Sequence, residues 1–321
     1  MSKIIKKVNH EVLKKTAKRC RERGIKIPTF QQLRDPRTIP DELKKKLAGV
    51  DLWDVNPINL FRISWKNNIK TGLYGNVNFL EIPKAVTGVK ARIIGLVGKY
   101  FPTGAHKVGA AFGCLVPRLV SGEFDPSTHK AVWPSTGNFC RGGAFDCALL
   151  DCTAVAILPE GMSKERFDWL KKIGAEVIAT PGSESNVKEI YDKCWELKKD
   201  TQNVIFNQFE EFGNSMFHYT VTGAAIEEAF KMLRSSSASL SAFVSATGSA
   251  GTIAAGDYLK KQNPDIKIIA AEALQCPTML MNGFGSHRIE GIGDKHIPWI
   301  HNVRNTDAVT AIDDEDCMKL F

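Results

Sequence analysis

The chain has 321 residues, of which 43% are hydrophobic and 24% charged, and its formal net charge is +8. These proportions are ordinary for a globular protein, the length suits two compact units, and no apolar run approaches the length of a membrane span. Residues 1–50 hold fifteen Lys or Arg against five Asp or Glu, a net charge of +10, so the remaining chain has a net charge of −2. The basic balance therefore belongs to an N-terminal appendage.

The appendage is predicted to be mainly helical. Residues 9–23 read as a basic helix and residues 41–47 as a short second one, with prolines between them. The first nine residues lack a signal-peptide core, and the acidic Glu11 and Glu22 argue against an organellar transit peptide. Because no aromatic residue interleaves the early basic residues, a solvated helix face is favoured over contact with nucleic acid or an acidic partner.

Beyond the appendage, residues 66–88 show no clean period and are predicted to be an irregular insertion. Apolar runs that predict strands then occur at 92–97, 131–133, 154–158, 177–179, 204–206, 242–245 and 267–271. Helical stretches are predicted near 108–120, 139–150, 164–173, 185–199, 215–234 and 250–262. This alternation predicts an α/β fold with parallel sheets, helices on both faces and ligands at the carboxyl ends of strands.

Cysteine spacing argues against disulfides and metal. The eight cysteines form no C-x-x-C pair, and no His/Cys group has zinc spacing. A reducing compartment, most simply the cytoplasm, is expected. Cys140 is predicted to be a packing cysteine near a pocket, with a reactive thiol as the alternative.

The string Thr103-Gly104-Ala105-His106-Lys107 places a lysine after a glycine turn, at the head of the predicted helix 108–120. An ammonium group is electrostatically misplaced there, because the amino end of a helix already carries partial positive charge. A bound anionic cofactor would make the position favourable, and a desolvated amine can form a Schiff base.

Two further small-residue turns lie between a predicted strand and a predicted helix: Ser135-Thr136-Gly137-Asn138 and Thr247-Gly248-Ser249-Ala250-Gly251-Thr252. Backbone N–H and hydroxyl groups at such turns can hold carboxylate or phosphate oxygens. The second turn lacks the G-x-G-x-x-G spacing of a dinucleotide site.

Together these three segments resemble the signature of the fold-type-II pyridoxal-phosphate enzymes, which include cysteine synthases, threonine and serine dehydratases and tryptophan synthase beta chains. Weaker matches are Asn56 to Arg62, similar to an entry strand of the family, Gln208-Phe209 followed by His218-Tyr219 and Thr222-Gly223, and Glu290-Gly291-Ile292-Gly293. The resemblance covers about residues 55–321. It implies pyridoxal phosphate as the cofactor, no metal, and two parallel-sheet α/β domains of the tryptophan synthase beta-like architecture.

The resemblance also implies a role for each site residue. Lys107 would form the internal aldimine and carry the proton at the substrate α-carbon, with His106 near the phosphate. The phosphate loop would consist of Thr247, Gly248, Ser249, Ala250, Gly251 and Thr252. Asn138 would bind the ring oxygen of the cofactor. The substrate would be held by Ser135, Thr136, Gly137 and Asn138, with Gly291 in the closing loop.

The activity implied is β-elimination or β-replacement on a small amino acid through an aminoacrylate, as in cysteine synthases or cysteine and serine lyases. Indole chemistry is disfavoured because no acidic residue occupies 135–139. A threonine synthase or dehydratase, a silent cofactor-binding regulatory subunit, and a nucleotide-binding α/β protein without pyridoxal phosphate are the alternatives.

The predicted regions are the appendage (1–50), a large cofactor-binding domain (51–100 with 214–321) and a small domain with the lysine and substrate loop (101–213). In the family, a Ser or Thr hydroxyl beyond the closing loop serves the ring nitrogen, and the chain reaches Phe321 first. A C-terminus that is shortened, interrupted or completed by another chain is therefore expected, and so is a homodimer.

Overall fold

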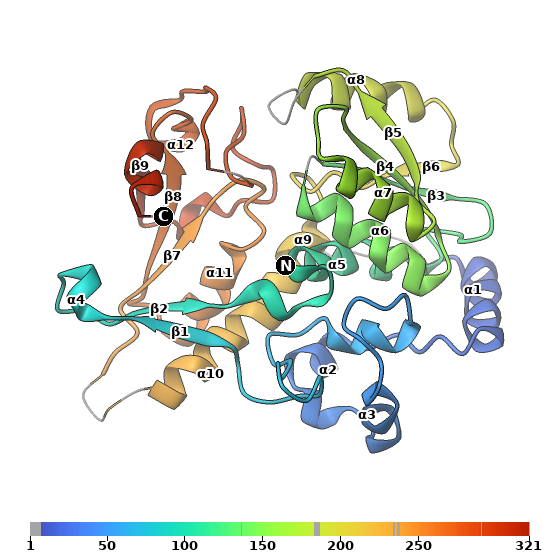
Figure 1. Ribbon diagram of the computed structural model, residues 1–321, viewed down its shortest axis with the longest axis horizontal. Helices are drawn as coiled ribbons and strands as arrows, with labels where there is room; N and C mark the ends of the chain where they lie inside the picture. The colour runs from blue at the N-terminus through green and yellow to red at the C-terminus, as the bar shows by residue number, and fades with distance from the viewer. Residues whose placement is uncertain are drawn as a thin grey trace.

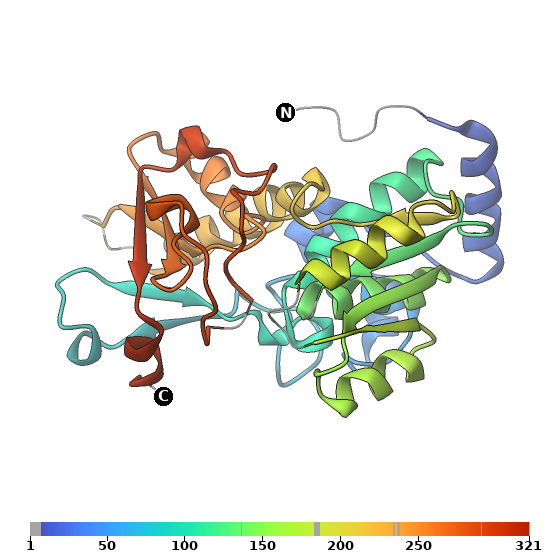
Figure 2. The same ribbon diagram turned by 90° about the horizontal axis from the view of Figure 1, so that it is seen from above.

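Two parallel β-sheets, each packed against helices, lie side by side in the computed structural model (Figure 1, Figure 2). The structure describes residues 8–135, 137–182, 187–233, 235, 238–289 and 291–320. Its strands are β1 (Phe79–Ile82), β2 (Ile93–Leu96), β3 (Lys130–Pro134), β4 (Thr153–Pro159), β5 (Glu176–Thr180), β6 (Asn203–Ile205), β7 (Ala242–Ala246), β8 (Lys267–Ala273) and β9 (Ala308–Ile312).

The α-helices are α1 (His10–Glu22), α2 (Phe30–Arg34), α3 (Asp41–Leu47), α4 (Lys84–Thr87), α5 (Lys107–Ser121), α6 (Asn138–Leu150), α7 (Lys164–Lys172), α8 (Val187–Leu197), α9 (Phe212–Phe217), α10 (Gly223–Leu233), α11 (Ala254–Gln262), α12 (Thr278–Met281) and α13 (Asp314–Met318). Short 3₁₀ turns lie at Pro36–Thr38, Pro57–Arg62, Gly98–Tyr100, Pro102–Gly104 and Val303–Asn305, and a π-helical turn at His218–Thr222.

The first sheet has the strand order β5-β4-β3-β6, with every pair parallel. Side chains of β3 alternate between two apolar clusters: Ala131 and Trp133 pack with α5 and α6, whereas Val132 packs with Ile190 of α8. Because successive side chains of a strand point to opposite faces, helices cover both faces of this sheet. The predicted α/β class is confirmed.

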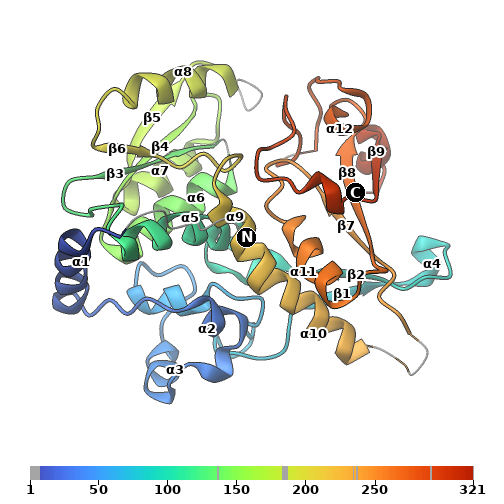
Figure 3. The same ribbon diagram turned by 180° about the vertical axis from the view of Figure 1, so that it is seen from behind.

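The second sheet has the order β7-β8-β9, again parallel. Ile268 and Ala270 of β8 pack against Leu259 of α11 and Ala224 of α10. α10 leaves the centre of the molecule and runs along this part of the structure (Figure 3). The second sheet therefore packs against α10 and α11, which follow the first sheet along the chain.

Two predictions about the middle of the chain are wrong, and a predicted helix contains a π-helical turn. Residues 66–88 are not wholly irregular, because they include β1 and α4. The strand predicted at 92–97 is β2, and it pairs antiparallel with β1 and not with a parallel sheet. The expected entry strand at 56–62 is a 3₁₀ helix: Asn56 Oδ1 accepts from the Ile58 N–H at 3.1 Å, and Pro57 suits the first helical position. The expected helix 215–234 is α9, the π-helical turn and α10 in succession.

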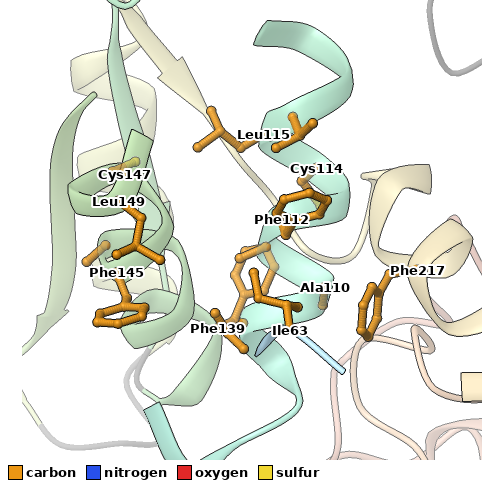
Figure 4. Close-up of a cluster of buried hydrophobic side chains, with 14 of the residues drawn as sticks. Ile63, Ala110, Phe112, Cys114, Leu115, Phe139, Phe145, Cys147, Leu149 and Phe217 are labelled. Carbon is orange, nitrogen blue, oxygen red and sulfur yellow. The ribbon is translucent and has the colours of Figure 1, made fainter. Parts of the chain in front are cut away.

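The main core joins α5, α6 and α9. Phe112 of α5, Phe139 and Phe145 of α6, and Phe217 of α9 are each at most 1% exposed (Figure 4). The N-terminal helix α1 packs on the same body through the Arg19–Asp151 ion pair at 2.6 Å. Among the described helices, none is long and apolar enough to cross a bilayer.

Candidate active site

Lys107 is the first residue of α5 and follows a turn in which Thr103 and Gly104 have φ values of 66° and 71°. Its Nζ donates to Ser249 Oγ at 2.9 Å and to Gln208 Oε1 at 3.1 Å. Burial lowers the pKa of Lys107 from 10.5 to about 8. This amine therefore loses its proton far more readily than a surface lysine does.

Close helix packing fixes the start of α5. A Cβ on Gly113 would lie 2.2 Å from the carbonyl oxygen of Gly213 in α9, so only glycine allows these backbones to approach. On the other side, a Cβ on Gly142 of α6 would lie 2.7 Å from Val108 Cα and 3.0 Å from the Lys107 carbonyl oxygen. The lysine backbone is held between two neighbouring helices.

The segment Thr247 to Thr252 connects β7 to α11 and contacts the lysine directly. Besides accepting from Lys107, Ser249 Oγ accepts from Asn214 Nδ2 at 3.2 Å. Ala250 has a φ of 56°, and a Cβ on Gly251 would lie 1.9 Å from Asn214 Oδ1. The sequence forms a tight loop of small residues. The hydroxyls of Ser249 and Thr252 face Lys107 and His106, whereas the Thr247 hydroxyl donates to the Ala271 carbonyl oxygen of β8 at 3.3 Å.

The Gly291 to Gly293 segment packs over this loop. The Gly293 N–H donates to the Thr247 carbonyl oxygen at 2.9 Å, and a Cβ on Gly248 would lie 3.2 Å from the Gly291 carbonyl oxygen. Gly291 and Gly293 have positive φ values of 78° and 82°, which glycine adopts without strain. The predicted closing loop thus lies against the predicted phosphate loop; Glu290 lies outside the described residues.

The predicted substrate loop follows β3 and leads into α6. Gly137 donates its N–H to Ser135 Oγ at 3.2 Å, and Asn138 is the first residue of the helix. Thr136 lies outside the described residues. Cys140 is 2% exposed, and burial raises the pKa of its thiol to about 12, which favours the packing role. The helix α6, which begins at Asn138, approaches the start of α5 at Gly142.

His106, which precedes Lys107, contacts the far end of the predicted phosphate loop. Its Nε2 is 3.4 Å from Thr252 Oγ1. Burial, followed by the charge of Lys107, lowers the pKa of His106 to about 4. The imidazole is therefore neutral at physiological pH and carries one ring proton.

Three polar residues near the lysine had no role predicted from the sequence: Gln208, Asn214 and His218, whose ring meets that of His106. Gln208 and His218 stood in weak family matches, whereas Asn214 follows no pattern that would identify it. Asn214 is fully buried and also donates to the Gln208 carbonyl oxygen at 3.0 Å. Asn214 can be identified as a site residue only from the structure, because the packing of α9 brings it to Ser249.

These residues fit pyridoxal phosphate, which needs an amine for its aldehyde and an anion site for its phosphate. Lys107 supplies an amine of lowered pKa. Ser249 and Thr252 supply hydroxyls on a loop whose two glycines add no side chain of their own. This set of donors suits a phosphate oxygen better than a metal ion, which prefers carboxylate, imidazole or thiolate ligands.

Comparison with known proteins gives consistent matches. The family described as "Pyridoxal-phosphate dependent enzyme" matches residues 73–321. The chain is 32% identical over 220 residues to a cysteine synthase of Staphylococcus aureus, covering 68% of this chain and 69% of the relative. It is 31% identical over 248 residues to cysteine synthase B of Campylobacter jejuni, covering 77% and 79%. A hydrogen sulfide-producing enzyme from Fusobacterium nucleatum superposes with a TM-score of 0.68 at 26% identity, covering 76% and 79%.

Proposed function

The chain belongs to the family of pyridoxal-phosphate dependent enzymes, and from this premise we propose that it catalyses β-elimination or β-replacement on a small amino acid, as cysteine synthases do. The observation that carries the proposal is the buried Lys107 amine, which contacts Ser249 of the Thr247 to Thr252 loop at 2.9 Å. An amine and an anion cradle in direct contact are what this cofactor requires.

When bound, pyridoxal phosphate supplies an aldehyde for amines and an electron sink that makes the substrate α-proton acidic. Lys107 would both hold the cofactor and carry that proton, because its lowered pKa leaves a usable fraction of neutral amine near neutral pH. Gln208 and Ser249 orient the Nζ atom through their hydrogen bonds.

The substrate carboxylate binds at the turn between β3 and α6. Ser135 supplies a hydroxyl, and the N–H groups at the start of α6 face an anion with the positive end of the helix dipole. Asn138 at this helix start would bind the ring oxygen of the cofactor. The Gly291 to Gly293 segment, already in contact with Thr247, excludes water from the substrate side.

The cellular setting is proposed to be a reducing cytoplasm, with the protein as a homodimer. All eight cysteines fall within the described ranges and are free. Val244 of β7 is 56% exposed and Ile312 of β9 is 42% exposed, which supports self-association of apolar surface.

The test is an absorbance spectrum of the purified protein after addition of pyridoxal phosphate, repeated with O-acetylserine, cysteine and threonine. We expect a visible band that Lys107→Ala abolishes, a spectral change with O-acetylserine or cysteine, and formation of cysteine or pyruvate. A response to threonine alone would support the threonine synthase or dehydratase alternative. A band that no amino acid changes would indicate a silent binder, and no band would overturn the proposal.

A further inference from the structure

A buried polar column of Trp65, Thr222 and His218 leads to His106 beside the lysine. Trp65 is 5%, Thr222 1% and His218 0% exposed. His218 and Thr222 bound the π-helical turn between α9 and α10, the region seen from behind in Figure 3. Such turns interrupt regular helix geometry and often occur at functional sites.

The hydrogen bonds that join Trp65, Thr222 and His218 share one donor-to-acceptor direction, from Trp65 to His218. The Trp65 Nε1–H donates to Thr222 Oγ1 at 2.9 Å, since indole nitrogen is only a donor. Thr222 Oγ1 is also 2.9 Å from His218 Nδ1. Within the described residues, this nitrogen is the acceptor available to the Thr222 hydroxyl proton, so Nδ1 accepts and the ring proton of neutral His218 lies on Nε2.

Both Trp65 and His218 contact the ring of His106. Trp65 stacks on it, with ring centroids 5.8 Å apart and planes 22° apart. His218 meets it nearly edge to face, with centroids 5.2 Å apart and planes 76° apart. Held in this way, His106 presents Nε2 to Thr252 Oγ1 of the phosphate loop at 3.4 Å.

We propose that His218 is a positioning residue: with Trp65 and Thr222 it fixes His106 in the orientation that meets the phosphate loop. In the described part of the chain, His218 Nε2 is buried and has no hydrogen-bond partner. A buried polar nitrogen without a partner costs free energy that an apolar ring of similar size would avoid. A role in orienting His106 accounts for a histidine at position 218, whereas packing alone does not.

The inference rests on the proposed function, because it concerns affinity for pyridoxal phosphate. It also extends the site beyond the family match, since Trp65 precedes residue 73, where that match begins.

The test compares three full-length variants with the wild type. Thr222→Val removes the hydroxyl that bonds His218 and keeps the side-chain shape. Thr220→Val, in the same π-helical turn, is the matched control because Thr220 takes no part in the column. Trp65→Phe keeps an aromatic ring on His106 and removes the N–H donor. The readouts are the dissociation constant for pyridoxal phosphate, from titration of cofactor-free protein, and the ³¹P resonance of the bound phosphate.

We expect Thr222→Val to raise the dissociation constant about three- to tenfold and to shift the ³¹P resonance, because it removes the buried hydrogen bonds of Thr222 Oγ1 to both Trp65 and His218. Trp65→Phe is expected to do the same to a smaller extent, and Thr220→Val to leave both readouts unchanged. If Thr222→Val does not fold, the dissociation constant and the ³¹P resonance of Trp65→Phe provide the test. Equal affinities and ³¹P resonances in all variants would overturn the inference while leaving the proposed function intact. A wild type that binds no pyridoxal phosphate would refute the proposed function itself.

Discussion

Lys107 is expected to destabilise the cofactor-free protein near neutral pH, and Lys107→Met is expected to relieve this cost. Methionine matches the length of the lysine chain without its charge. A pKa of about 8 instead of 10.5 means that the folded protein disfavours the charged amine by about 3 kcal/mol. The lost hydrogen bonds to Ser249 and Gln208 offset about 1–2 kcal/mol of this gain. Lys107→Met should therefore raise the free energy of unfolding at pH 7 by about 1–2 kcal/mol.

The pH dependence gives a sharper signature than the magnitude. The folded pKa lies below the unfolded one, so between about pH 8 and 10.5 the unfolded chain binds more protons at this lysine. The stability of the wild type consequently rises with pH across that window relative to the variant. The advantage of Lys107→Met should shrink by about 2 kcal/mol between pH 7 and pH 10.

The assay is urea unfolding followed by circular dichroism without pyridoxal phosphate, at pH 7 and pH 10. Lys172→Met, which removes an exposed lysine at the end of α7, is the matched control and should change stability little. A Lys107→Met protein less stable than the wild type at pH 7, or a difference independent of pH, would refute the reasoning.

Gly251→Ala should raise the dissociation constant for pyridoxal phosphate at least about tenfold, because its Cβ would lie 1.9 Å from Asn214 Oδ1; Ala250→Gly, which relieves a positive φ in the same loop, should not weaken binding. Gly113→Ala should lower the free energy of unfolding by about 2–3 kcal/mol in urea, since the new Cβ would lie 2.2 Å from a carbonyl oxygen of α9. Asp146 is fully buried with both carboxyl oxygens unpartnered among the described residues, and burial raises its pKa well above the ordinary value. Its folded pKa exceeds the unfolded one, so the wild type loses stability as pH rises above about 4, and Asp146→Ala should gain about 1–2 kcal/mol at pH 7 but not at pH 3, measured by thermal unfolding.

The sequence was most informative where local chemistry decides the structure. The lysine at the head of α5 and the turn after β7 were both recognisable, because each places small residues between a strand or turn and a helix. The strands at 130–134, 153–159 and 242–246 were predicted from apolar runs, with errors of about one residue at their ends. Local patterns of this kind need no knowledge of distant partners.

Where long-range packing decides the structure, the sequence failed. β1 was missed because its half-exposed residues gain strand structure only by pairing with β2. Asn214 was missed because its partner Ser249 lies 35 residues away along the chain. Thr222 stood in a weak family match, but its bond to Trp65, 157 residues away, could not be read from the sequence. The roles assigned to the motif residues and the division into domains stay predictions, since they concern binding and folding units.

The basic N-terminal segment is joined to the site by apolar and polar contacts, which argues against an independent charged tail. Phe30 packs edge to face on Phe112 of α5, with ring centroids 5.8 Å apart, and Arg34 donates to the Tyr258 hydroxyl at 3.2 Å. Beyond this segment, Trp65 stacks on the ring of His106. Because Phe112 lies on the helix that begins with Lys107, loosening the segment would disturb the lysine even though its charges face solvent. The segment outside the family match therefore packs on α5, the helix that begins with Lys107, and on α11.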